Sequence, residues 1–74
     1  MATIGERAVK EIKKRARQNG ISTSKEGAKL YITSTILAHW KNGFNPSASY
    51  LQQMALAGYD VIYILTGKEN KNEN

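Results

Sequence analysis

The feature of this sequence that most limits its fold is a series of helix start and stop signals at short intervals. Thr3 is followed by Glu6 with the spacing of a capping box, and Gly20 is placed to end the helix that begins there. Thr23 and Glu26 repeat the capping-box spacing after a short linker. The signals predict a compact all-α domain of four to five short helices.

The signals continue through the second half of the chain. Thr33 is a good cap for a third helix that ends at Asn42–Gly43, after a second helix of about two turns. A loop with the only proline, Pro46, follows. We expect a fourth helix from Ser47 to Gly58, and a fifth over 61–66 that Asp60 caps and Gly67 stops.

The first helix is amphipathic. Apolar residues fall within one arc of the helical wheel: Ile4, Ala8, Val9, Ile12 and Ala16. Basic residues fall on the opposite side: Arg7, Lys10, Lys14 and Arg17. We expect the apolar arc in the core and the basic arc in solvent, with only one end of it near a bound phosphate.

The third helix has two contrasting sides. Winding at 3.6 residues per turn places Ile32, Ile36, Leu37 and Trp40 on one side. The other side collects small, polar residues: Ser34, Thr35, Ala38, Lys41 and Asn42. This polar side suits the floor of a DNA major groove, although an ordinary solvated helix face would show the same pattern.

The net charge of +5 is unevenly distributed. Residues 1–20 carry a net +4 and residues 21–43 a net +2, whereas 44–67 carry −1. The positive charge therefore lies in the half that holds the second and third helices, as in nucleic-acid-binding proteins. A basic surface that serves only solubility is the alternative.

Several kinds of chemistry are not expected. The chain has no cysteine and a single histidine, His39, so the usual zinc sites and catalytic triads cannot be assembled. We expect no metal, no cofactor and no enzymatic activity. No apolar run approaches the length of a membrane span, and the N-terminus lacks a signal-peptide core, so we expect a soluble, intracellular protein.

The segment 59–65 is apolar or aromatic at every position except Asp60. Because one side of a short helix can face its own core, the remainder predicts a dimer interface formed by Tyr59, Ile62 and Tyr63. The alternative is that a small domain buries this helix all round. The polar residues 68–74 have no apolar member and are expected to be a disordered tail after a single domain of residues 1–67.

Four segments of the second half form a recognisable series: Trp-Lys-Asn-Gly at 40–43, Pro-Ser at 46–47, Tyr-Leu-Gln-Gln-Met-Ala-Leu-Ala-Gly at 50–58 and Ile-Tyr-Ile-Leu-Thr-Gly at 62–67. Together they resemble the lambda-repressor-like helix-turn-helix family, which includes phage repressors and Cro-type regulators. The resemblance covers roughly residues 4–67. It departs from the family at the turn before the third helix, where Tyr31 stands and no glycine is present. The small residue where the two helices cross is Gly27 in one register and Ala28 in the other.

The resemblance implies a transcription regulator that binds a double-stranded DNA operator, normally as a homodimer, in the cytoplasm of a bacterial cell and encoded by the host or a phage. Its third helix, about Thr33–Asn42, would enter the major groove, and its first and second helices would anchor phosphates. The residues implied to read base edges are Thr33, Ser34, Thr35, Ala38 and His39. Those implied to contact phosphates are Ser24, Lys25, Tyr31, Lys41, Asn42 and Asn45. A helical protein-interaction module that uses 59–65 to bind an antirepressor, an inhibitor or a toxin is the other hypothesis.

Overall fold

The computed structural model describes residues 2–68, and all the regular secondary structure within them is α-helical. The helices are α1 (Ile4–Asn19), α2 (Thr23–Ala28), α3 (Ser34–Lys41), α4 (Ala48–Leu56) and α5 (Val61–Thr66). The radius of gyration is 11.7 Å, close to the value of about 11 Å expected for a compact domain of this length. The prediction of a compact all-α fold is confirmed. The predicted polar tail lies outside the described residues from position 69 onward.

Most of the predicted helix starts are confirmed. At α1, Glu6 N–H donates to Thr3 Oγ1 (3.1 Å) and Thr3 N–H donates to Glu6 Oε1 (2.8 Å), which completes the capping box. Thr33 caps α3 by accepting from the backbone N–H of the third helical residue. Asp60 does the same for α5.

The predicted cap of α2 is wrong by one residue. Ser22, not Thr23, has extended backbone angles and accepts from Lys25 N–H (3.1 Å), so Thr23 is already helical. Serine and threonine both favour the N-cap position. Ser22 takes it here because its hydroxyl lies three positions before the free N–H of Lys25. Glu26 is consequently too far along the helix to close a capping box.

Glu26 instead forms a buried polar contact between α1 and α2. Its side chain is almost fully buried, accepts from Asn19 Nδ2 (3.0 Å) and lies 3.4 Å from Lys29 Nζ. Burial of the carboxylate acts to raise its pKa, but the hydrogen bond from Asn19 and the charge of Lys29 act in the opposite direction, and the net result is a lowered pKa. The ionised form is therefore the one that the fold favours.

The lowered pKa of Glu26 predicts a loss of stability in acid. A group whose folded pKa lies below its unfolded value, here 4.5, stabilises the fold above that pH and ceases to do so as pH falls through the folded pKa. We expect the free energy of unfolding to decrease below about pH 4.5 more steeply in the wild-type protein than in Glu26→Gln. Urea titrations of both proteins at several pH values measure this. Parallel pH profiles would contradict it.

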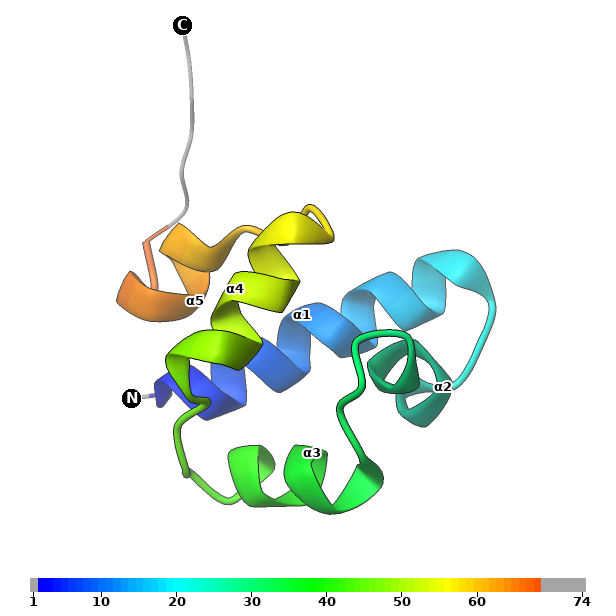
Figure 1. The fold of residues 1–74 in the computed structure, drawn as a ribbon, viewed down its shortest axis with the longest axis horizontal. Helices are drawn as coiled ribbons and strands as arrows, with labels where there is room; N and C mark the ends of the chain where they lie inside the picture. Colours follow the sequence, from blue (N-terminus) through cyan, green and yellow to red (C-terminus); the bar gives the residue numbers. More distant parts are fainter. Residues whose placement is uncertain (1, 69–74) are drawn as a thin grey trace, which may run out of the picture.

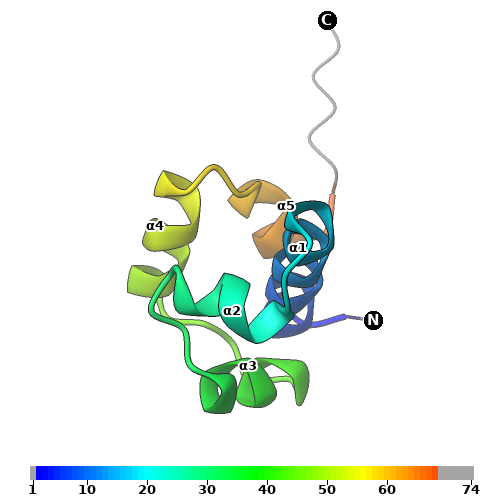
Figure 2. The same cartoon turned by 90° about the vertical axis from the view of Figure 1, so that its right-hand side faces the viewer.

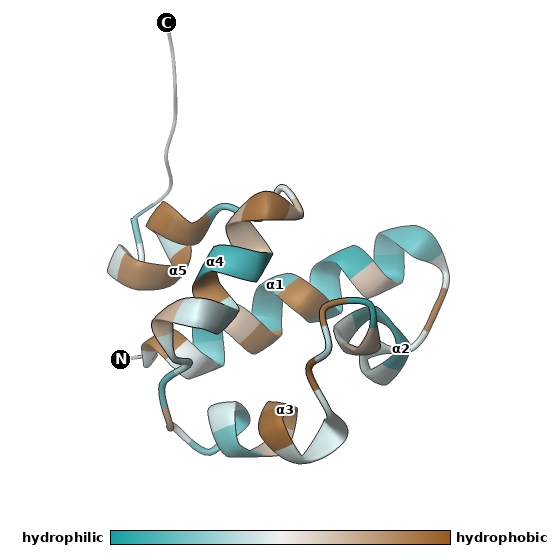
Figure 3. Ribbon diagram, viewed as in Figure 1, coloured by the Kyte–Doolittle hydropathy of each residue, from teal (hydrophilic) through white to brown (hydrophobic). Residues whose placement is uncertain are grey.

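The core is formed around α1, which crosses the middle of the molecule in Figure 1 and is seen end-on at its right-hand side in Figure 2. Ile12 of α1, Ile32 before α3, Met54 of α4 and Ile64 of α5 are completely or almost completely buried. Further buried apolar residues complete the same cluster: Ala8, Leu30, Leu37, Trp40 and Tyr59. The predicted apolar arc of α1 therefore faces the core. Figure 3 shows hydrophilic and hydrophobic residues alternating along α1.

Two arginines of α1 attach the C-terminal helices to it. Arg7, expected in solvent, donates from Nε to Ile64 O (2.8 Å) and from Nη2 to Leu65 O (3.2 Å), at the end of α5 where carbonyl groups lack helical partners. Arg15 donates to Ala57 O (2.7 Å), and its guanidinium lies 3.7 Å from the ring centre of Tyr59. Part of the basic arc is therefore structural.

The turn between α2 and α3 is made without a glycine. Tyr31 adopts a left-handed conformation, with φ of 61°, and its side chain is 81% exposed. Behind it, Ile32 N–H donates to Gly27 O (2.9 Å) and directs the Ile32 side chain into the core. Gly27 is buried, and a Cβ there would lie 3.1 Å from Leu37 Cδ1, whereas Ala28 is exposed. Gly27 is thus the small residue at the helix crossing.

The left-handed Tyr31 predicts a stability difference between two substitutions. Because a Cβ in this conformation costs roughly 1–2 kcal/mol, Tyr31→Gly is expected to be more stable than Tyr31→Ala by about 1 kcal/mol. Both variants remove the same exposed ring, so the comparison isolates the backbone. Chemical denaturation of the pair is the measurement. Equal stability would show that the turn relaxes to another conformation.

Candidate nucleic-acid interface

Helix α3 lies at the outer edge of the molecule, below α1 and α2 in both views (Figures 1 and 2). Its inner side contributes Leu37 and Trp40 to the core, and Ile36 is half-buried. The residues predicted for its polar side are all exposed: Ser34, Thr35, Ala38, Lys41 and Asn42. The structure therefore gives α3 one buried side and one free side, as the spacing predicts.

Not every residue predicted to read bases has a free polar group. The hydroxyl of Thr33 accepts the cap hydrogen bond from Ile36 N–H (3.2 Å), although its side chain is exposed. His39 packs its ring edge-to-face against Phe44, with 5.6 Å between the ring centres. Ser34 lies with its hydroxyl 3.5 Å from that of Ser24 on α2. Thr35 has no such contact within the described residues.

A groove of about 270 Å³ runs between α1, α2 and α3, and we call it the α1–α3 groove. Its walls include Ser34, Ala38 and Lys41 from α3, Ser24 from α2, and Lys13 from α1. The structure thus brings together two residues predicted to contact phosphates, Ser24 and Lys41, with two predicted to read bases. None of the residues that line the groove is acidic.

The other predicted phosphate contacts are exposed but do not line this groove. Lys25 lies on α2, Tyr31 in the turn, Asn42 at the end of α3 and Asn45 in the loop before α4. They surround the α2–α3 pair on the surface. Nothing in their contacts distinguishes them from ordinary solvated side chains.

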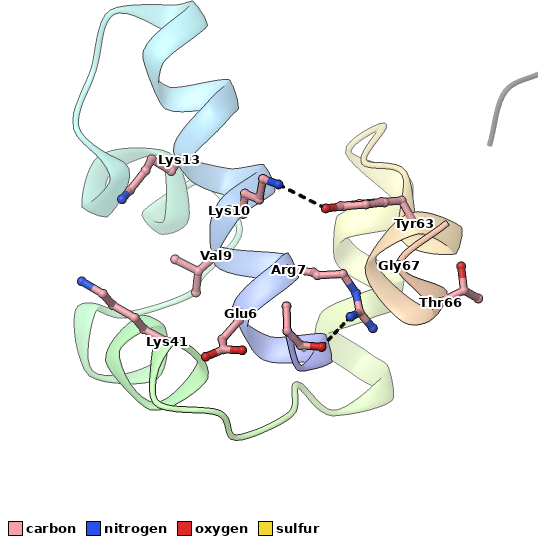
Figure 4. Close-up of a pocket in the computed structure, with 10 residues that line it drawn as sticks. Glu6, Arg7, Val9, Lys10, Lys13, Lys41, Tyr63, Thr66 and Gly67 are labelled. Carbon is pink, nitrogen blue, oxygen red and sulfur yellow. Dashed lines mark hydrogen bonds between the residues drawn. The ribbon is translucent and has the colours of Figure 1, made fainter. Parts of the chain in front are cut away.

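A larger groove of about 710 Å³, the α1–α5 groove, adjoins the first one and shares Val9, Lys13 and Lys41 with it. Figure 4 shows α1 along its floor, with Tyr63 and Thr66 of α5 opposite Lys41. Lys13, which the sequence analysis did not select, therefore lines both grooves. Its position four residues after Val9, at the edge of the apolar arc, is the signal that could have identified it.

The predicted dimer interface is partly wrong. Tyr59 is buried in the core with the guanidinium of Arg15 over its ring, so little of the side chain is left for a partner to contact. Its hydroxyl is buried, and no residue in the range 2–68 forms a hydrogen bond with it. By contrast Ile62 is 53% exposed and Tyr63 is half-buried, with its hydroxyl 3.5 Å from Lys10 Nζ. Leu65 is also exposed.

Among residues 2–68, no group of three or more His, Cys, Asp or Glu side chains is arranged to hold a metal ion. Within the same residues, no helix combines the length and apolar character needed to cross a membrane. Comparisons of the chain with protein-family models, with curated proteins and with solved structures gave no match.

Proposed function

We propose that this protein is a transcription regulator that binds duplex DNA through α3, as a homodimer on a palindromic operator. The observation that supports the proposal is the free polar side of α3. It combines hydroxyl groups with the small Ala38, lies at the edge of the molecule and is bordered by lysines. An exposed helix of this kind fits the major groove, where hydroxyl groups bond to base edges and Ala packs against a thymine methyl.

The electrostatics of the chain support the same proposal. The net charge of +5 comes mainly from the part that contains α1, α2 and α3. Phosphate contacts by lysine release counterions, so DNA affinity is expected to fall steeply with salt. The sequence resemblance to lambda-repressor-like regulators, including Thr66–Gly67 after a short apolar helix, points in the same direction.

Selection of bound sites from a random duplex library tests the proposal directly. The expected result is an enriched palindrome whose half-sites lie about 34–36 Å apart, which is one turn of duplex. A mobility shift at low salt with random duplex is the preliminary measurement. Failure to bind any duplex at low salt would overturn the proposal.

Two classes of substitution in α3 should then behave differently. Thr35→Ala is expected to relax base preference by about 1–3 kcal/mol at one position, because a base-edge contact carries sequence information. Lys41→Ala is expected to lower the affinity for all sequences alike and to reduce the slope of log K against log[salt] by about 1 for each protomer bound, because a phosphate contact carries no sequence information. Equilibrium titrations on the selected operator and on single-position variants measure both. The same uniform loss for both variants would contradict α3 as the reading helix.

A second candidate function rests on the exposed apolar residues of the C-terminal half. Leu56 is 82% exposed, and Ile62 and Leu65 on α5 are about half exposed. Such residues suit a protein interaction module that binds another protein in place of DNA. This second candidate would replace the first on two results together. The protein would fail to bind duplex DNA, and Ile62→Ser would weaken its binding to a protein partner.

A further inference from the structure

We propose that the α1–α5 groove is a binding site for a small aromatic carboxylate. In this site the carboxylate lies between the ammonium groups of Lys13 and Lys41, and the aromatic body lies on Val9 and reaches toward Tyr63. The inference goes beyond the proposed function, and the site itself does not depend on DNA binding.

The size of the α1–α5 groove is the first argument. Its volume of about 710 Å³ lies within the range of roughly 300–1,000 Å³ that small-molecule sites occupy. The α1–α3 groove, of about 270 Å³, falls below that range. Residues of α1, α3 and α5 form the walls of the larger groove, so it lies where three helices meet.

The apolar floor of the groove is the second argument. Val9 and Tyr63 pack against the core and are each half-buried, so part of both side chains remains exposed to solvent. In Figure 4, Val9 lies between Tyr63 on one side and the two lysines, Lys13 and Lys41, on the other. Apolar surface in a groove favours a ligand with an apolar body, and the ring of Tyr63 favours an aromatic one. A wholly polar anion such as phosphate would leave this surface uncovered.

The charge of the lining is the third argument. Four basic residues and one acidic residue line the groove. The acidic one, Glu6, already accepts from Thr3 N–H (2.8 Å) in the capping box of α1. Among the basic ones, Arg7 donates to carbonyl groups of α5. The charge that is left for a ligand is therefore positive and belongs to the lysines.

The arrangement of these lysines places the free positive charge at one end of the groove. Lys10 donates to the Tyr63 hydroxyl (3.5 Å). Lys13 and Lys41 are exposed and have no ion pair with any residue in the described range 2–68. In Figure 4 their side chains extend on the same side of Val9, away from Tyr63. Two like charges held on one side repel each other, and a bound carboxylate relieves that repulsion.

Titration with 2-naphthoate, followed by ¹H–¹⁵N NMR spectra, tests the site. The alcohol 2-naphthalenemethanol has the same rings without the charge, and acetate has the charge without the rings. We expect 2-naphthoate to bind with a Kd on the order of 0.1–1 mM, as ligand efficiency allows for a molecule of this size. It should bind about tenfold more tightly than the alcohol, because two exposed ammonium groups contribute about threefold each. The shifted amides should include those of Val9, Lys13, Lys41 and Tyr63, and acetate should not displace the ligand.

Substitution of two neighbouring lysines tests the carboxylate contact. Lys13→Gln should lower the affinity for 2-naphthoate about threefold and leave the affinity for the alcohol unchanged. Lys14→Gln is the matched control, because it removes the same charge from the adjacent residue, which borders a different pocket beside Glu11 and Asp60. It should retain the wild-type affinity for both ligands.

Val9→Thr tests the apolar floor. It replaces a methyl group by a hydroxyl, so it should lower the affinity for the acid and for the alcohol alike. Spectra without ligand show whether each variant is folded, and the comparison of the two lysine variants decides the test if Val9→Thr is not.

Three results would overturn the site. The first is no binding of 2-naphthoate, or equal affinity for the acid and the alcohol. The second is equal affinity of the Lys13→Gln and Lys14→Gln proteins for the acid. The third is a set of shifts confined to amides near Leu56, Ile62 and Leu65, which would indicate adsorption to the exposed apolar residues.

Binding in this groove should also lower the affinity for duplex DNA, an effect that rests on the proposed function. Lys41 lines the groove and is one of the proposed phosphate contacts, so a carboxylate paired with it reduces the charge available to the duplex. Operator titrations with saturating 2-naphthoate, and with the alcohol as control, measure the effect. An unchanged affinity for the operator would overturn this effect. A protein that binds 2-naphthoate but no duplex would overturn the proposed function and leave the site in place.

Discussion

Gly5→Ala is expected to lower the free energy of unfolding by at least about 3 kcal/mol, at the upper end of what overpacking costs. Gly5 is buried in the first turn of α1, against the end of α3 and the loop that follows it. A Cβ there would overlap Phe44 O and lie 2.8 Å from Trp40 O. Both atoms belong to the backbone, so no side-chain rotation relieves the clash. The gain of about 1 kcal/mol in helix propensity from Gly to Ala is too small to offset it.

Gly27→Ala is the matched control for this experiment, because it makes the same change at the other buried glycine of a helix. Its Cβ would lie 3.1 Å from Leu37 Cδ1 and 3.2 Å from Ile32 O. The leucine methyl can move by a few tenths of an ångström, so the loss should be about 1 kcal/mol. Urea denaturation of both variants gives the comparison. A Gly5→Ala protein as stable as Gly27→Ala would mean that α1 and α3 do not approach as closely as described.

Ile64→Ala is expected to cost about 2–5 kcal/mol of stability, because it leaves a cavity where a fully buried side chain was. Ile64 is on α5, so the result tests whether this helix belongs to the core of the domain. The free energy of unfolding of a small domain is low, so a loss of this size is a large part of it. We expect the variant to be largely unfolded at 37 °C, as measured by thermal denaturation followed by circular dichroism.

Ile62→Ala makes the identical change on the same helix at a side chain that is 53% exposed. Its effect on the stability of the monomer should be within about 0.5 kcal/mol. If α5 also forms the proposed dimer interface, this variant should dissociate at lower concentration in sedimentation experiments. Equal destabilisation by Ile62→Ala and Ile64→Ala would contradict the burial pattern of α5.

Helix boundaries and the two sides of α3 were predictable because they depend on local chemistry. Thr3, Thr33 and Asp60 bond to their own helices, and the spacing of Leu37 and Trp40 alone determines which side of α3 is buried. Competition between neighbours is harder to judge. Ser22 and Thr23 are neighbours that both favour the N-cap position, and the sequence analysis chose the wrong one.

What the sequence could not show depends on contacts between distant segments. Arg7 contacts carbonyl groups 57 and 58 residues away, and Tyr59 is covered by Arg15 of α1. Helical periodicity assigns such residues to a solvated or an apolar side but does not identify their partners. Lys13 was overlooked for the same reason, since it lines the α1–α3 groove only because residues of α2 and α3 lie across from it.

The hydrogen bonds of Arg7 also bring the beginning and the end of the described chain together. The same guanidinium that donates to Ile64 O and Leu65 O donates to Ala2 O (2.6 Å). A short peptide joining the two ends would therefore leave the helices in place, and the chain could be reopened in the loop around Asn45. Circular permutation is thus open to this fold, with α2, α3 and the turn between them left as one uninterrupted segment.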